Sequence, residues 1–375
     1  MLRKRDMEEK KDSGTRWIAG VEPPAELRGR DMISVYETEY REQPERLAQL
    51  FRGYQNDSAI RKELDTLREM SRSSGPILLI GMGASYCSCI TGASYLQSGG
   101  RSAFALDASE WLHYSATWDQ AALSLLVTAS GESAELVRLC EKAAQQPLAL
   151  LCNNDRSTCW SLIRNKLPIL AGPEYGNATK TYTNATAACI VLASHILGRS
   201  WHEEAAPIVE SYSRSLDALF QQRRTIEEFC RGAANIEIIG RGPAYGAAIM
   251  GALCIREMTG QRAAPHSGGG FRHGPLLDVN ESHVAIILAL GRTATLGVTL
   301  AKDCLSRGGR VILVESVESD ESPHSERLLP IRIDPVPGPW EGITSVLVPQ
   351  ALTLAIAERF GAKLAPRFQY GEMKE

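Results

Sequence analysis

The chain has 375 residues, of which 44% are hydrophobic, and a formal net charge of −3. That length can bury one large hydrophobic core or two of ordinary size. Lysine and arginine are scattered along the sequence, which argues against a nucleic-acid-binding surface. The nine cysteines lie mostly inside apolar runs and lack the spacing of metal ligands. We therefore expect buried, reduced thiols in a cytoplasmic protein, and no bound metal.

The N-terminal segment, residues 1–32, is predicted to be a solvated charged tail. It carries charges of both signs and lacks the apolar stretch of a signal peptide. No apolar run reaches the roughly 20 residues that a membrane-spanning helix needs, so no membrane partner is expected. Residues 33–75 have helical character, and these leading helices are expected to pack ahead of a first sheet.

A strand, a tight glycine turn and a helix occur twice, and this duplication is the strongest internal signal. The first copy lies at 76–88 and contains Gly81-x-Gly83, and the second lies at 236–247 and contains Gly240-x-Gly242. Apolar runs and segments of helical spacing alternate after each copy. The buried strands predicted in this way are 122–130, 147–154, 283–290 and 310–316.

Such alternation predicts an α/β protein with two tandem, doubly wound parallel sheets that carry helices on both faces. We place the first lobe at 76–205 and the second lobe, with the catalytic candidates, at 231–375. An amphipathic linker helix at 206–230 is expected to join them.

A glycine turn after a first strand is also typical of dinucleotide sites. Here Tyr86 and Tyr245 replace the third glycine of that motif. No acidic residue is clearly positioned after a second strand to bind a ribose. NAD therefore remains a minor alternative, and no cofactor is expected.

The segment VTASGESAELV at 127–137 is a candidate anion site. A strand is expected to end at Val127 and a helix to begin near Glu132. Hydroxyl groups and backbone N–H groups would then gather at a positive helix N-terminus. The hydroxyl groups are those of Thr128, Ser130 and Ser133.

Ser85, in the first glycine turn, should lie beside this segment, because both turns leave the carboxyl ends of neighbouring strands. The alternative is that Ser130 only caps the helix, with Glu132 or Glu135 completing a capping box. The second copy has no comparable segment. One anion site, in the first lobe, is therefore predicted.

These features resemble the sugar isomerase (SIS) domain family, whose lobes are flavodoxin-like. Within it the chain is similar to the isomerase half of glucosamine-fructose-6-phosphate aminotransferase and to stand-alone deglycases and deaminases. The likeness covers roughly 33–375. The motifs that carry it are YETEYREQPERL (36–47), GMGASYCS (81–88), DASEWLHY (107–114), TASGES (128–133), AGPEYGNATKTYT (171–183), GALCIREM (251–258) and FRHGP (271–275).

The resemblance implies a homodimer that binds a sugar phosphate. It implies that Glu257 moves a proton between C1 and C2 of the sugar. It also implies that His273, contributed across the dimer interface, assists ring opening or proton transfer. Without the resemblance, Glu257 would be interpreted as a surface carboxylate paired with Arg256 or Arg262, and His273 as a solvent-facing loop residue. The substrate-binding residues that it implies are Ser85, Thr128, Ser130, Ser133, Glu174 and Lys180.

Departures from the family pattern narrow the expected reaction. Cys254 stands where the aminotransferase has a lysine, Ala129 stands where it has a glutamine, and no glutamine-hydrolysing domain is present in the sequence. These changes favour a deglycase that cleaves a fructosamine 6-phosphate to glucose 6-phosphate and an amino acid. An amino-sugar-phosphate deaminase or isomerase is the nearest alternative. A non-catalytic sugar-phosphate sensor is an alternative of another class.

Overall fold

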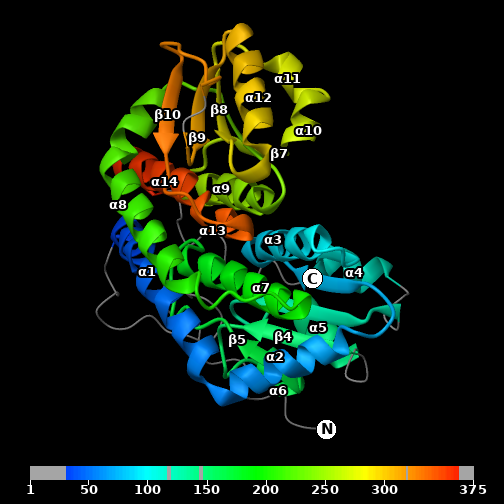
Figure 1. Cartoon of the computed structure of the whole chain (residues 1–375). Helices are drawn as coiled ribbons and strands as arrows, with labels where there is room; N and C mark the ends of the chain where they lie inside the picture. The colour runs from blue at the N-terminus through cyan, green and yellow to red at the C-terminus, as the bar shows by residue number, and fades with distance from the viewer. Residues whose placement is uncertain (1–30, 116–119, 143–146, 318–319, 363–375) are drawn as a thin grey trace.

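The computed structural model describes residues 31–115, 120–142, 147–317 and 320–362. They form two lobes, each built on a five-stranded parallel sheet (Figure 1). The first sheet has the order β2-β1-β3-β4-β5, and the second has the order β10-β9-β8-β6-β7. The prediction of two doubly wound, flavodoxin-like α/β lobes is therefore confirmed.

Apolar clusters cover both faces of the first sheet. Leu79 belongs to the main core under α3 and α7, whereas its neighbour Ile80 belongs to a second cluster on the opposite face. This inward and outward alternation of apolar side chains is typical of parallel sheets buried on both sides. The elements are β1 (Ile77–Gly81), α3 (Ala84–Ser98), β2 (Ala103–Asp107), α4 (Ala108–Tyr114), β3 (Leu123–Thr128), α5 (Ala134–Lys142), β4 (Leu148–Cys152), α6 (Thr158–Leu162), β5 (Asn165–Pro168) and α7 (Lys180–Leu197).

The second lobe repeats this topology. Its sheet, taken from its other edge, has the order β7-β6-β8-β9-β10 and so matches the first sheet strand for strand. A separate apolar cluster that includes Phe271 and Val298 covers its outer face. The elements are β6 (Asn235–Gly240), α9 (Pro243–Thr259), β7 (Ala263–Ser267), α10 (Gly268–Arg272), α11 (Pro275–Asp278), β8 (His283–Leu288), η3 (Gly291–Thr293), α12 (Ala294–Ser306), β9 (Arg310–Glu315) and β10 (Leu328–Arg332).

The two glycine turns have the same backbone conformation. Gly83 has φ 53° and ψ −125°, and Gly242 has φ 53° and ψ −127°, a combination open almost only to glycine. The first glycine of each motif has a different role. A β-carbon on Gly81 would lie 2.8 Å from the carbonyl carbon of Ser85, and one on Gly240 would lie 2.3 Å from the carbonyl oxygen of Ala244. These glycines let each helix pass close to its strand.

The lobes are joined by direct packing of α3 against α9. At their closest approach, a β-carbon on Gly246 would lie 2.3 Å from the carbonyl oxygen of Cys87. The hydroxyl of Thr91 on α3 donates to the carbonyl oxygen of Pro243 at 2.9 Å. The main hydrophobic cluster continues across this contact into both lobes. The helices that follow the two glycine turns therefore share one core.

The remaining helices bind the lobes together from one side. The helix predicted at 206–230 is observed as α8 (Ala205–Cys230), and it runs from the first lobe to the second (Figure 1). The leading segment forms α1 (Met32–Asn56) and α2 (Ser58–Met70). The leading helix α1 packs against α7, α8 and the C-terminal helix α14 (Leu347–Phe360), and α2 packs against β5 of the first sheet.

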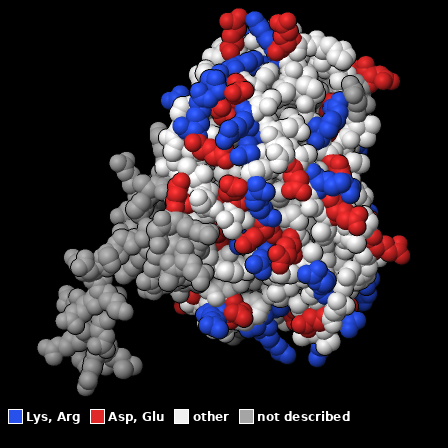
Figure 2. All heavy atoms as spheres, turned by 90° about the vertical axis from the view of Figure 1, so that its left-hand side faces the viewer, with Lys and Arg blue, Asp and Glu red and all other residues white. Residues whose placement is uncertain are grey.

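Most of the predicted N-terminal tail lies outside the described residues. Of the segment 1–32, the structure describes Asp31, whose carboxylate accepts the N–H of Ile33 at 3.2 Å, and Met32, which begins α1. On the face turned to the viewer in Figure 2, acidic and basic side chains are interspersed with uncharged ones. This face therefore has no extended field of one sign.

Among the described residues, one helical segment, Gly338–Phe360, has the length and average apolar composition that a membrane span would need. It comprises η4 (Gly338–Trp340), α13 (Glu341–Thr344) and α14. Its most apolar window has a mean hydropathy of 1.2, and 94% of that window is buried inside the fold. Packing in the shared core accounts for its composition.

Candidate active site

A cavity of about 410 Å³ opens at the carboxyl ends of β1 and β3. Its walls come from the first glycine turn, the turn before α5, the segment between β5 and α7, and the end of α9. Such a volume suits a small organic ligand. Six of the residues predicted for the site line it together: Ser85, Thr128, Ser130, Ser133, Glu174 and Glu257.

The turn after β3 is held by its own hydroxyl groups. The Thr128 hydroxyl accepts the N–H of Gly131 at 3.0 Å, and the Ser130 hydroxyl accepts the N–H of Glu132 at 3.3 Å. Each hydroxyl that accepts an N–H keeps its own proton to donate. Gly131 has φ 67°, and a β-carbon there would lie 2.1 Å from Oγ of Ser157. The turn is thus pre-formed with two O–H donors.

The helix predicted to start near Glu132 is α5, which begins two residues later, at Ala134. The capping box with Glu132 is not formed. The Glu132 carboxylate accepts the N–H of Thr158 at 2.9 Å and its hydroxyl at 2.8 Å. Glu132 therefore anchors the turn to α6, and the N-termini of both α3 and α5 border the cavity. Two helix N-termini with hydroxyl groups between them form a site suited to an anion.

Glu257 lies in the last turn of α9, across the cavity from these turns. Glu257 is exposed where it lines the cavity. Protein atoms packed around the carboxyl still desolvate it and raise its pKa to about 7, because a charged carboxylate is poorly solvated there. Within the described residues, Glu257 forms no ion pair with Arg256 or Arg262. A carboxyl that titrates near neutrality can both accept and return a proton.

Glu174 lines the cavity, but its carboxylate organises the chain. It accepts the N–H of Thr179 at 2.9 Å and the N–H of Thr181 at 3.2 Å, together with both threonine hydroxyls. These contacts cap the start of α7. Because the carboxylate already accepts four hydrogen bonds, we assign Glu174 the task of shaping the cavity wall.

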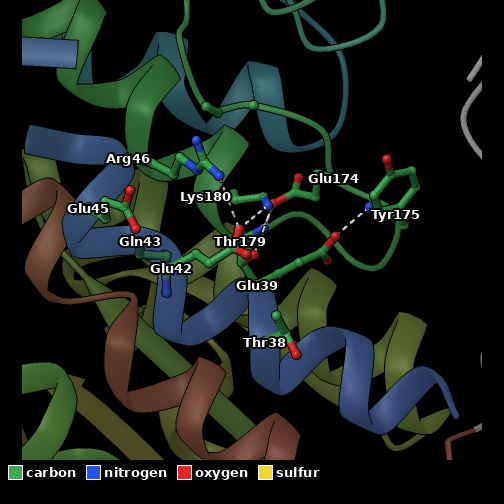
Figure 3. Close-up of polar contacts among 12 residues, drawn as sticks. Thr38, Glu39, Glu42, Gln43, Glu45, Arg46, Glu174, Tyr175, Thr179 and Lys180 are labelled. Atoms are coloured by element: carbon green, nitrogen blue, oxygen red, sulfur yellow. Dashed lines mark hydrogen bonds and ion pairs between the residues drawn. The ribbon is translucent and has the colours of Figure 1, made fainter. Parts of the chain in front are cut away.

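A second carboxylate holds the same segment from outside (Figure 3). Glu39 on α1 is buried and accepts the N–H of Tyr175 at 2.5 Å and the N–H of Gly176 at 3.1 Å. Burial, and then the nearby Glu174 carboxylate, raises the pKa of Glu39. The sequence placed Glu39 in a family motif without assigning it a role.

Replacing Glu39 by alanine is expected to loosen this wall. Two partly buried N–H groups would lose their acceptor, which costs about 2 kcal/mol of stability. We expect the KM for substrate to rise about tenfold with a smaller change in kcat, since misplaced binding groups weaken affinity by such factors. Steady-state kinetics and urea unfolding measure the two effects. Glu45→Ala, on the exposed face of α1, is the control, and an unchanged KM in Glu39→Ala would contradict this role.

Two predicted site residues lie away from the cavity. Lys180 is buried at the start of α7, and its ammonium group lies 2.5 Å from Oε2 of Glu42 (Figure 3). His273 is exposed after α10, and it is not among the residues that line the cavity. The structure of one chain therefore brings neither of them to Glu257.

The sequence interpretation missed one cavity residue of chemical interest. Glu135, in the first turn of α5, lines the cavity and is only 7% exposed. The sequence pattern suggested for Glu135 only a role in capping the helix that follows the anion turn. The nine cysteines are all buried and free, as expected. Within the described part of the chain, no three His, Cys, Asp or Glu residues gather as metal ligands would.

Comparison with known proteins agrees with this architecture. The family model described as "SIS domain" matches residues 70–195 and 231–356. Glutamine–fructose-6-phosphate aminotransferase (isomerizing) of Zymomonas mobilis is 28% identical over 320 residues, which cover 78% of this chain and 52% of that protein. The enzyme of the same name from Pyrococcus horikoshii is 27% identical, with coverage of 79% and 51%. The chain thus spans about half the length of the curated relatives it matches.

Solved structures share the fold along nearly the whole chain. The C-terminal domain of glucosamine-fructose-6-phosphate aminotransferase from Francisella tularensis gives a TM-score of 0.80 at 21% identity, covering 91% of this chain and 99% of that one. Tagatose-6-phosphate ketose/aldose isomerase from Escherichia coli gives 0.74 at 21% identity, with coverage of 91% and 95%. With its repeated topology and both matched segments, the chain belongs to the SIS domain family and contains two SIS domains in tandem.

Proposed function

We propose that the chain is a phosphosugar-processing enzyme, and that it removes the amine from a fructosamine 6-phosphate to release glucose 6-phosphate and an amino acid. One observation carries this proposal. Glu257, with its pKa raised to about 7, faces an anion-binding corner across a single cavity. A phosphate held at that corner would place the other end of the sugar toward the carboxylate.

The reaction follows from one proton transfer. The Glu257 carboxylate takes a proton from C1, which carries the protonated nitrogen, while the C2 oxygen takes a proton from that nitrogen, and an enaminol forms between C1 and C2. The same carboxyl returns the proton to C2, which leaves an imine between C1 and nitrogen. Water adds at C1, the C–N bond breaks, and the amine leaves with a proton. A base whose pKa lies near the working pH serves both transfers.

The residues around Glu257 favour a reaction that removes an amine from a sugar over one that adds an amine to it. Cys254, at the position where related aminotransferases have a lysine, is fully buried, and its thiol lies 3.8 Å from the carbonyl oxygen of Ala178. Burial raises the pKa of this thiol, so it stays protonated. The position offers no amine for Schiff-base chemistry.

We also infer that His273 acts on the sugar bound by a second copy of the chain, since it is exposed and lies apart from the cavity of its own chain. Co-expression of Glu257→Gln and His273→Asn chains tests this. Each variant alone is expected to be inactive, and the mixture to regain about a quarter of the activity, because half the dimers are mixed and each has one intact site of two. No recovery would place both groups on the same chain.

The proposed function is tested by incubating the purified protein with fructosamine 6-phosphates of several amino acids, glucosamine 6-phosphate and tagatose 6-phosphate. Glucose 6-phosphate, fructose 6-phosphate and free amine are followed together. Release of glucose 6-phosphate with an amino acid supports the deglycase. Fructose 6-phosphate and ammonia from glucosamine 6-phosphate would instead indicate a deaminase, and interconversion of a ketose and an aldose would indicate an isomerase. Binding without turnover of any compound would indicate a sensor.

A further inference from the structure

Carboxylates dominate the charge of the cavity. Glu132, Glu135, Glu174 and Glu257 line it, and among the described residues no lysine or arginine does. Two of the four have protein partners. Glu132 binds Thr158, and Glu174 binds Thr179 and Thr181, as described above. Glu135 and Glu257 are left to face the ligand.

Glu135 is the unusual member of this set. It is only 7% exposed, and it lines the cavity from the first turn of α5. No hydrogen bond or ion pair from the described residues reaches its carboxylate. Buried carboxylates in proteins are nearly always paired, because an isolated buried charge is costly. A group of the ligand is therefore the natural partner of Glu135.

The negative charge of the cavity and of a bound phosphate limits which group of the ligand can pair with Glu135. A phosphate at the N-termini of α3 and α5 adds negative charge to a cavity that already holds carboxylates. A positive group on the same ligand offsets this repulsion, and an ammonium group also donates hydrogen bonds to a carboxylate. A plain hexose phosphate has only hydroxyl groups to offer.

We propose that Glu135 binds the protonated nitrogen of the substrate and makes the cavity selective for amine-bearing sugar phosphates over plain hexose phosphates. This inference rests on the proposed function and deepens it. The ammonium form also withdraws electrons from C1, which makes the C1 proton easier for Glu257 to remove, and it passes one proton to the C2 oxygen as the enaminol forms, so that the nitrogen lone pair is free to form the imine.

The test compares two ligands that differ in one group at C1, fructosamine 6-phosphate (1-amino-1-deoxyfructose 6-phosphate) and fructose 6-phosphate. Their affinities are measured by isothermal titration calorimetry at pH 6.5 in full-length Glu257→Gln protein, so that turnover is suppressed. We expect fructosamine 6-phosphate to bind at least tenfold more tightly. Adding Glu135→Gln is expected to abolish this preference by weakening fructosamine 6-phosphate alone. Glu141→Gln, the same change on the exposed side of α5, is expected to leave both affinities unchanged.

Three results would overturn the proposal. Equal affinities in the Glu257→Gln protein would show that no group in the cavity recognises the amine. Equal weakening of both ligands by Glu135→Gln, with an unchanged melting temperature, would give Glu135 a general role in shaping the cavity. Failure of both ligands to bind would remove the sugar-phosphate site and the proposed function with it, whereas the first two results leave that function standing.

Discussion

Glu257→Gln is expected to lower kcat by about 10²–10⁴-fold, the usual contribution of a general base, while KM changes little. The amide has the size of the carboxyl but cannot accept the C1 proton. Stopped assays of glucose 6-phosphate release measure the loss. Arg256→Gln, on the adjacent exposed position of α9, serves as the control and should keep full activity. Full turnover by Glu257→Gln would exclude the proposed mechanism.

The proposed role of Glu257 as the base also predicts the pH dependence of the wild-type protein. Glu257 must be ionised to take a proton, and its pKa is raised to about 7. The rate should therefore rise with pH from 6 to 8 on the acidic side of the profile. A midpoint near 4.5, the ordinary pKa of a glutamate, would mean that another group is the base.

The melting temperature of Glu257→Gln distinguishes a loss of catalysis from a loss of folded protein. A raised pKa means that the folded chain binds the proton more tightly than the unfolded chain. The contribution of Glu257 to stability is then fully present below about pH 4.5 and declines as the pH rises through about 7. Glutamine removes this decline. The variant should melt at least as high as the wild type at pH 8.

Gly246→Ala is expected to give the largest loss of stability, about 3 kcal/mol or more, through overpacking of the shared core. Its β-carbon would lie 2.3 Å from the carbonyl oxygen of Cys87, a backbone atom that cannot rotate away. Alanine ordinarily stabilises a helix relative to glycine by up to about 1 kcal/mol, so the steric conflict decides the sign. Thermal and urea unfolding measure the effect.

The matched control for Gly246→Ala is Gly269→Ala in α10. A β-carbon there meets only a guanidinium nitrogen of Arg241, at 4.0 Å, and its stability should change by less than about 0.5 kcal/mol. Activity should fall in Gly246→Ala as well, because α9 carries Glu257 and must move away from α3. A Gly246→Ala protein with wild-type stability would show that α3 and α9 can move apart at little cost in free energy.

The central strands were predictable from sequence and the edge strands were not. Every residue of β1, β3 and β4 is buried, and each strand is mostly apolar, with Ser124 and Thr128 as the polar residues of β3. In β2 and β5, at the edges of the first sheet, only one residue of each is buried. Half-exposed strands carry polar residues and lose the pattern on which recognition depends. The same holds for β7 and β10 in the second sheet.

Whether a site residue could be predicted from the sequence depended on whether its contacts are local or involve residues far away in the chain. Ser85 and Ser130 follow buried strands, and parallel topology alone places them at one edge of the sheet. Lys180 was expected at the substrate, but its ammonium group binds Glu42, which is far away in sequence. The role of Glu39 depends on α1 lying against the segment before α7, as Figure 3 shows. Such pairings arise from the packing of distant helices, which no local pattern encodes.

The two lobes arose by duplication, but the turns that follow β3 and β8 carry different residues. In the second lobe, the turn after β8 contains Gly291 and Arg292 in place of the serine-rich segment. A carboxylate of the chain itself lies over it, with Oε2 of Glu341 placed 2.2 Å from where a β-carbon on Gly291 would be. That position is closed to an anionic ligand. Titration should therefore reach saturation at one sugar phosphate per chain, although the architecture has two lobes that are nearly copies of each other.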